Sequence, residues 1–148
     1  MMIKRMLVPL DGGDLAPRAI EAGIELAKQL GAAIVGFVVE PPVPLPSPGV
    51  HATPQGAVAS VEELRTDEHA QRLLGRFEER AGLAGVPFEG HSLRTREIDA
   101  AIVEAAQQHH CDLIVMVTHG RGVMSRLVAG SHTHKVLARS LLPVLVMH

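Results

Sequence analysis

The sequence predicts an α/β domain in which helices cover both faces of a doubly wound parallel sheet. Strand-like and helix-like segments alternate along the whole chain. Several strand-like segments are continuously apolar, which is typical of sheets covered on both faces. The 148 residues contain no repeat and no interdomain linker, so residues 1–148 are expected to form one domain.

Five strands and four helices are expected, joined by right-handed crossovers. The predicted strands are 3–9, 33–39, 87–93, 112–117 and 143–147, of which the third is of mixed polarity and suits a sheet edge. The predicted helices are 15–30, 61–84, 97–109 and 131–140, with Gly75 as a candidate break in the second. Residues 41–54 hold six of the ten prolines and show no periodicity, which predicts an irregular connection.

Composition excludes several functional classes. The net charge of −2 gives no basic field for a nucleic-acid backbone, and three phenylalanines are too few for a base-stacking platform. No apolar run approaches the roughly 20 residues of a membrane span, and the amino-terminal run is too short for a signal peptide. A cytoplasmic protein without membrane or nucleic-acid partners is therefore expected. Cys111, the single cysteine, is expected to be a buried and inert thiol rather than a reactive one.

Parallel sheets bind ligands beyond the carboxyl ends of their strands, where the strand order reverses. Asp11 follows the first predicted strand and Thr118 follows the fourth. After Thr118 come His119 and Gly120, then nine residues, and then Gly-Ser-His-Thr at 130–133, which opens a helix. The free N–H groups and the positive dipole end of a helix start favour phosphate.

Gly120 and Gly130 would let the backbone approach such a phosphate without an intervening Cβ. Other side chains there could bind it or offset its charge: Ser131, Thr133, His119, Arg121 and His132. Alternatively, the two glycines only shape a turn and Ser131 is an ordinary helix cap. One glycine-containing helix start does not decide between these readings.

Longer motifs give this pattern a family context. Residues 113–148 contain Thr-His-Gly-Arg-Gly, Ser-Arg-Leu-Val-Ala-Gly-Ser and Pro-Val-Leu-Val, and they resemble the carboxyl-terminal signature of universal stress proteins. Leu-Val-Pro-Leu-Asp-Gly at 7–12 resembles the first strand and turn of that family. Phe-Val-Val-Glu at 37–40 resembles the end of its second strand. The order and spacing match over essentially the whole chain.

The resemblance implies an adenine nucleotide alpha-hydrolase-like fold with strand order 3-2-1-4-5. It also implies a homodimer that pairs through the last strand, here 143–147. The nucleotide-binding branch of the family carries Gly-x2-Gly-x9-Gly followed by Ser or Thr. Gly120, Gly130 and Ser131 match this motif, whereas Val117 stands at its first glycine. The valine side chain could crowd a ribose or phosphate, or it could point into the sheet and leave the backbone free.

The resemblance further implies an adenosine site. Pro9 and Asp11 would lie near the adenosine, and Asp11 would accept a hydrogen bond from it. Val38 would pack against adenine, and Met116 and Val117 would line the same cleft. From the residues alone, Val38 and Met116 suit the core equally well, and Asp11 could instead cap a helix.

We therefore expect a stress-response protein that binds ATP or a related adenine nucleotide, with a cation such as Mg²⁺ bridging the phosphates. No nucleophile with an adjacent base is apparent, so a regulatory role is expected and any ATP hydrolysis would be slow. The alternative is a dimeric scaffold of the same fold that binds no nucleotide.

The nine histidines raise the question of a metal site. They include His109-His110 beside Cys111, and His132 with His134, but neither spacing is the i, i+4 chelate of a helical zinc site. No metal site is therefore expected.

Overall fold

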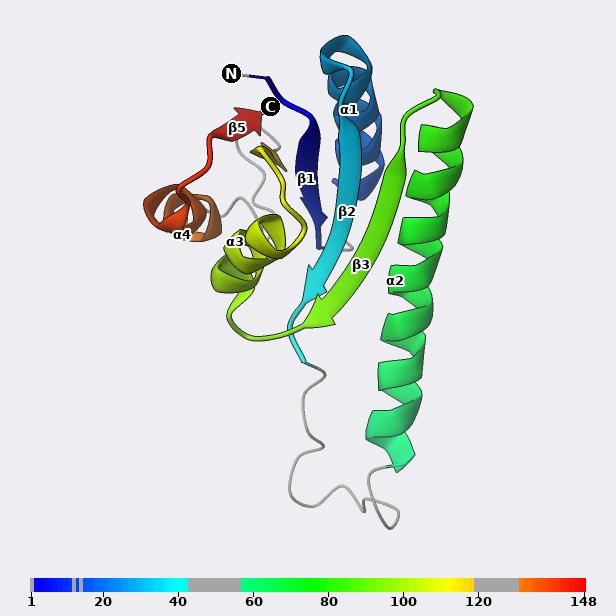
Figure 1. The fold of residues 1–148 in the computed structure, drawn as a ribbon. Coiled ribbons are helices and arrows are strands. Elements are labelled where there is room, and N and C mark those ends of the chain that lie inside the picture. Colours follow the sequence, from blue (N-terminus) through cyan, green and yellow to red (C-terminus); the bar gives the residue numbers. More distant parts are fainter. Residues whose placement is uncertain (1, 12, 14, 43–56, 119–130) are drawn as a thin grey trace.

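Five parallel strands form one sheet in the order β3-β2-β1-β4-β5 (Figure 1). The computed structural model describes residues 2–11, 13, 15–42, 57–118 and 131–148. The strands are β1 (Arg5–Leu10), β2 (Ala33–Glu40), β3 (Phe88–Arg94), β4 (Leu113–Val117) and β5 (Val144–Met147). The predicted strand order is confirmed, and β3 lies at a sheet edge as its mixed polarity indicated.

Four helices alternate with these strands: α1 (Ala16–Leu30), α2 (Ala57–Leu83), α3 (Ile98–Gln108) and α4 (Ser131–Arg139). The first two pack on one face of the sheet and the last two on the other. The predicted break in α2 is wrong, because the helix continues through Gly75. A Cβ added at Gly75 would meet no neighbouring atom within 4 Å, so this glycine is neither a turn nor a close contact. Within the described residues, no helix is long and apolar enough to cross a membrane.

The core consists of two mainly aliphatic layers, one on each side of the sheet. Along β1, Met6, Val8 and Leu10 pack towards α1 and α2, whereas Leu7 packs towards α3 and α4. This alternation follows from the two-residue period of a strand. Both faces are apolar because both are covered, which explains why the sequence shows no alternation between polar and apolar residues.

Asp112 fixes the relative position of β1 and β4. Its Oδ2 accepts hydrogen bonds from the backbone N–H groups of Lys4 (2.9 Å) and Arg5 (3.0 Å). Its own N–H donates to the carbonyl of Arg5 at 2.8 Å. The two strands therefore start together and, being parallel, end at the same edge of the sheet. The strand order reverses between these two strands, so their carboxyl ends flank the reversal point of the sheet.

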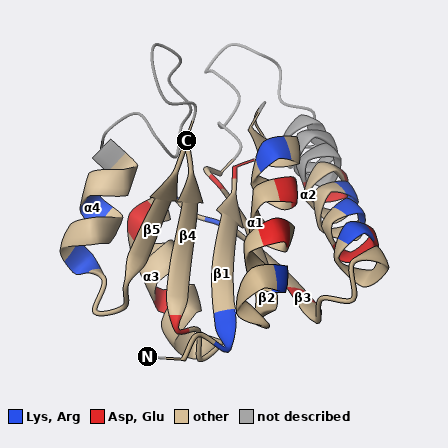
Figure 2. Ribbon diagram, turned by 90° about the horizontal axis from the view of Figure 1, so that it is seen from above, with Lys and Arg blue, Asp and Glu red and all other residues tan. Residues whose placement is uncertain are grey.

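The exposed faces of α1 and α2 carry both signs of charge. Acidic and basic side chains are interspersed along the two helices (Figure 2). Arg80 of α2 and Glu21 of α1 form an ion pair of 2.5 Å between them. Over the parts of these two helices whose side chains are described, charges of both signs alternate.

Candidate functional site

Three apolar side chains form a row at the carboxyl edge of the three central strands. Leu10 of β1 is paired with Val38 of β2, and Val117 ends β4 on the other side of β1. All three belong to the cluster that faces α1 and α2, and none is more than 6% exposed. The three strands that carry this row, β2, β1 and β4, are neighbours in the sheet, and the strand order reverses between β1 and β4.

A small hollow lies over this row, where α1 begins. It is lined by Pro9, Leu10, Asp11, Leu15, Ala16, Ala19 and Val117, and its volume is about 10 Å³. Such a space holds roughly one water molecule. The sequence left open whether Val117 faces a cleft or the core. In the structure its side chain does both, because it packs in the core and also lines this hollow.

Asp11 turns the chain between β1 and α1. Its Oδ1 accepts a hydrogen bond of 2.9 Å from the backbone N–H of Gly13, which is an Asx turn. A Cβ on Gly13 would lie 3.0 Å from this oxygen, so the glycine allows the close approach. Among the described residues at the start of α1, Leu15 is the N-cap and makes no side-chain capping bond. The bond from Gly13 to Asp11 thus lies within the turn that precedes α1.

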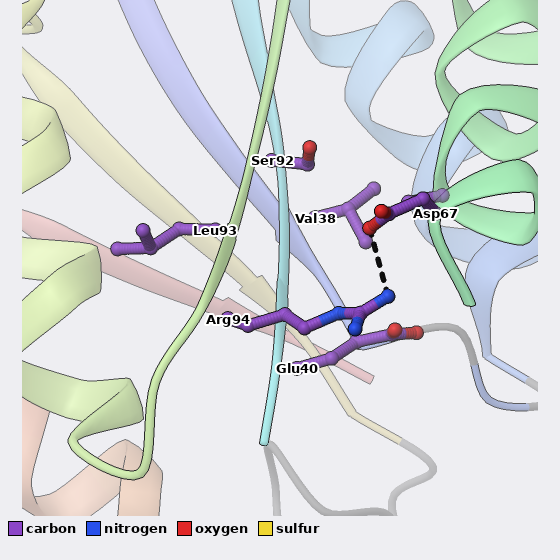
Figure 3. Close-up of a pocket in the computed structure, with 7 residues that line it drawn as sticks. Val38, Glu40, Asp67, Ser92, Leu93 and Arg94 are labelled. Carbon is purple, nitrogen blue, oxygen red and sulfur yellow. Dashed lines mark hydrogen bonds and ion pairs between the residues drawn. The ribbon is translucent and has the colours of Figure 1, made fainter. Parts of the chain in front are cut away.

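A larger hollow of about 180 Å³ lies at the carboxyl ends of β2 and β3, beside α2 (Figure 3). It is lined by Val38, Glu40, Asp67, Ala70, Ser92, Leu93 and Arg94. The guanidinium of Arg94 donates a hydrogen bond of 2.7 Å to Asp67 across it. Small-molecule sites usually measure about 300–1,000 Å³, so this hollow suits one planar base rather than a whole nucleotide.

The structure separates Met116 from the other expected adenosine contacts. Met116 is 1% exposed and packs with Leu7 and Val136 on the α3 and α4 face. Val38 and Val117 lie on the opposite face. The resemblance assigned both Met116 and Val117 to one cleft, yet neighbouring residues of a strand point to opposite faces. Only the backbone of Met116 could contribute to the site formed by the other two.

Ser131 begins α4, as expected for the helix start that follows β4. In the next residue, the buried Nδ1 of His132 has no hydrogen-bond partner among the described residues. Thr133 is half-buried in the same turn. The rest of the predicted phosphate site lies outside the described residues, namely His119, Gly120, Arg121 and Gly130.

Thr118 has a role that its position in the sequence did not indicate. It is 3% exposed and directly follows β4. Its backbone N–H donates to the carbonyl of Met147 at 2.6 Å, and its Oγ1 lies 2.8 Å from Nδ1 of His148. These bonds tie the end of β4 to the end of β5 immediately before the connection to α4.

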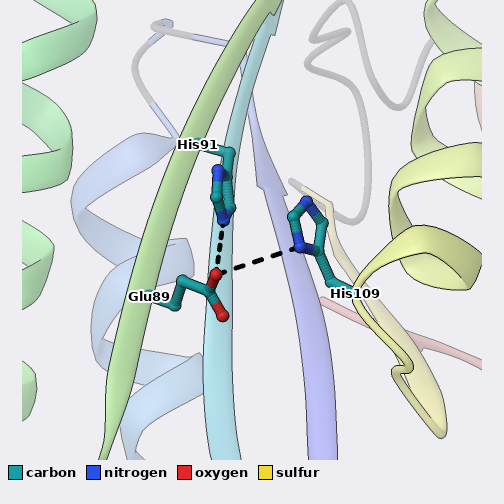
Figure 4. Close-up of side chains that lie close together, drawn as sticks. All are labelled: Glu89, His91 and His109. Carbon is teal, nitrogen blue, oxygen red and sulfur yellow. Dashed lines mark hydrogen bonds and ion pairs between the residues drawn. The ribbon is translucent and has the colours of Figure 1, made fainter.

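Sequence reasoning also missed a group formed by Glu89, His91 and His109 (Figure 4). Hydrogen bonds from His91 and Arg5 lower the pKa of the Glu89 carboxyl. Burial is the main cause that lowers the pKa of His109. The only signal in the sequence is the alternate spacing of Glu89 and His91 on a strand.

Cys111 is buried, as expected, with 5% of its surface exposed. Burial raises the pKa of its thiol to about 11. The thiolate is the reactive form of cysteine, so this residue suits the core rather than chemistry.

Comparison with solved structures places this geometry among known proteins. A universal stress protein from Burkholderia pseudomallei superposes with a TM-score of 0.77 at 26% identity, over 99% of this chain and 96% of that one. An Archaeoglobus fulgidus universal stress protein solved with dAMP gives 0.60 at 19% identity, over the whole of both chains. An Arabidopsis thaliana universal stress protein with AMP bound gives 0.65 at 16% identity, over 97% of this chain and 90% of that one.

Sequence comparison gives the same result. The family model of the universal stress protein family matches residues 2–148. A universal stress protein of Thermus aquaticus is 32% identical over 148 residues, 99% of each chain. A relative in Methanocaldococcus jannaschii is 30% identical over 147 residues, 99% of this chain and 82% of the relative. This chain therefore belongs to the universal stress protein family.

Proposed function

We propose that this protein binds ATP or a related adenine nucleotide at the carboxyl edge of its sheet and acts as a nucleotide-dependent regulator. The observation that carries the proposal is the apolar row of Leu10, Val38 and Val117, set beneath the turn at Asp11 where the strand order reverses. This is the location at which open parallel sheets bind their ligands. The dAMP and AMP complexes of two relatives with this fold support the choice of an adenine nucleotide.

The proposed pose uses groups of contrasting chemistry. The base lies over Val38 in the larger hollow, where the lining is partly apolar. The carboxylate of Asp11 accepts a hydrogen bond from a ribose hydroxyl, because an ionised carboxylate can only accept. The phosphates lie at the start of α4, where free N–H groups and the helix dipole favour negative charge.

His132 supports the phosphate half of this pose. Its buried Nδ1 has no protein partner in the described chain, and leaving a buried polar atom without a partner is costly. A phosphate oxygen would accept a hydrogen bond from a protonated ring nitrogen there. Mg²⁺ would then be held mainly by the phosphates and water, as is usual for this cation.

A homodimer through β5 is the proposed assembly. This strand is one edge of the sheet, and an unpaired edge can bind a second copy of itself. Its Leu145 is 38% exposed, and the neighbouring Leu141 is 90% exposed. Light scattering of a Leu145→Lys variant tests this, with Leu93→Lys on the opposite edge strand β3 as a matched control. We expect Leu145→Lys to be a monomer, and the wild type and Leu93→Lys to be dimers. A monomeric wild type would refute the proposed dimer.

A dimeric scaffold without nucleotide is the second candidate, and a specific observation favours it. The hollow beside Asp11 measures only about 10 Å³, and it is lined in part by Val117, which stands where the family motif has a glycine. In this case the protein would act through protein contacts alone.

One experiment decides between the two. Protein purified without added nucleotide is denatured, and the supernatant is analysed for adenine nucleotides by chromatography. Nucleotide-free protein is then titrated with ATP and Mg²⁺ in a calorimeter. We expect co-purified nucleotide or saturable heat with one site per chain. The absence of both at millimolar ATP would leave only the scaffold.

A further inference from the structure

Glu89, His91 and His109 meet on the side of the sheet opposite the proposed nucleotide site. The Phe88 ring packs against Phe77 of α2, with ring centroids 4.8 Å apart. Alternate residues of a strand share a face, so Glu89 and His91 point away from α2, towards the end of α3. His109 follows the last residue of α3 and reaches the same place (Figure 4).

The donor atoms of the three side chains converge. Oε1 of Glu89 lies 2.9 Å from Nε2 of His91 and 4.0 Å from Nδ1 of His109. The two imidazole rings are stacked, with centroids 4.0 Å apart and planes inclined by 20°. Each residue offers one ligand atom, and these atoms all lie within 4.8 Å of one another.

Two imidazoles and a carboxylate are a donor set that suits zinc. With bonds of about 2.0–2.2 Å, the ligands of tetrahedral zinc lie roughly 3.3 Å apart. The two separations from Glu89, 2.9 and 4.0 Å, lie on either side of this value, so a metal ion would need the side chains to shift by about 1 Å. The side chains have room to rotate, since the exposed fractions are 47% for Glu89, 36% for His91 and 23% for His109.

The backbone holds His109 in place. The N–H of His110 donates to the carbonyl of Gln107 at 3.1 Å, and the N–H of Cys111 donates to Ala106 at 2.8 Å. His110 has a left-handed backbone with φ of 55°. These features define a Schellman motif, which ends α3 and fixes the position of the residue before the left-handed one.

Arg5 orients the carboxylate from the other side. Its Nη2 donates to Oε2 of Glu89 at 2.6 Å, which leaves Oε1 facing the two imidazoles. Hydrogen bonds of this kind are typical behind metal ligands. The positive charge of Arg5 opposes a cation, so it limits the affinity of the site.

We propose that Glu89, His91 and His109 bind a divalent transition metal of the zinc class, with water at the open coordination positions. Nitrogen ligands favour zinc, nickel or copper over Mg²⁺, which prefers oxygen. The site links the edge strand β3 to the end of α3. It is separate from the nucleotide site, whose apolar row lies on the α1 and α2 face.

Titration of nucleotide-free protein with Zn²⁺ tests the proposal, and Co²⁺ serves as a spectroscopic substitute. We expect one saturable equivalent per chain with micromolar affinity, and visible absorption of Co²⁺ in a low-symmetry site. Glu89→Gln, His91→Gln and His109→Gln should each weaken Zn²⁺ binding at least about tenfold. His134→Gln, an exposed histidine on α4, is the matched control and should bind as the wild type does.

Circular dichroism and the melting temperature without metal show whether each variant is folded. As a second readout, saturating Zn²⁺ should raise the melting temperature of the wild type but not of the His91→Gln, His109→Gln double variant. The proposal is overturned if the wild type has no saturable site below about 0.1 mM Zn²⁺, which is weak binding on the affinity scale. It is also overturned if the double variant binds like the wild type, or if His134→Gln loses binding equally.

Discussion

Thr118 and His148 share a hydrogen bond of 2.8 Å between Oγ1 and Nδ1. The bond joins the residue that follows β4 to the residue that follows β5. We predict that Thr118→Val and His148→Ala each lower the free energy of unfolding by about 1 kcal/mol, the usual net value of one hydrogen bond. Urea unfolding of the two single variants and the double variant measures their coupling. Strictly additive effects would show that the bond contributes nothing.

Val117→Gly should tighten nucleotide binding, because it enlarges a hollow of only about 10 Å³ beneath Asp11. The loss of a buried valine should also cost roughly 1.5–3 kcal/mol of stability. Val115→Gly is the matched control, since Val115 lies on the same strand and face but is not among the residues that line the hollow. Calorimetric affinities of the two variants are compared, and equal affinities would mean that Val117 does not restrict the site.

Gly130→Val should abolish nucleotide binding. If phosphate meets the backbone before Ser131, a branched side chain would stand between them. Gly75→Val adds the same side chain on α2, where an added Cβ meets nothing within 4 Å, and should leave affinity unchanged. Calorimetry with ATP and Mg²⁺ measures both variants. If Gly130→Val bound ATP with the affinity of the wild type, the phosphates would have to bind at another place.

Gly36→Ala should destabilise the protein by about 1–3 kcal/mol, the usual cost of overpacking a core. Its new Cβ would lie 2.8 Å from the Phe88 ring and 3.2 Å from Phe77. Gly75→Ala should instead stabilise α2 by up to about 1 kcal/mol, because alanine favours a helix interior. Thermal unfolding measures both changes. A neutral Gly36→Ala would show that the Phe88 ring moves aside freely.

Much of the fold could be predicted because strands that are buried on both faces have continuously apolar sequences. β1, β2 and β4 are covered on both faces, so their residues are continuously apolar and were recognised. The order of the strands came from the family resemblance, since periodicity does not encode it. The break at Gly75 was wrong because intrinsic helix propensity costs only about 1 kcal/mol at a glycine. Packing of Leu74 and Phe77 against the core holds the helix across it.

The candidate site was less predictable, for two physical reasons. Met116 and Val117 were assigned to one cleft, although strand geometry sends neighbouring side chains to opposite faces. In the sequence, His109 stands beside His110 and Cys111, which suggests no partner from β3. Its actual neighbours lie on β3, and the chain brings them together only through the folded sheet.

The hydrogen bonds from Lys4 and Arg5 to Asp112 have a consequence for synthesis on the ribosome. They join residues 108 and 107 positions apart, and they hold together the two strands at the centre of the sheet. Until residues 113–117 emerge, β1 has an unpaired edge although β2 and β3 are already complete. A nascent chain therefore exposes one edge of β1, which can act as a template for wrong pairing, until β4 has been synthesised. The exposed edge of β1 is covered once β4 pairs with it and Asp112 accepts its hydrogen bonds from Lys4 and Arg5.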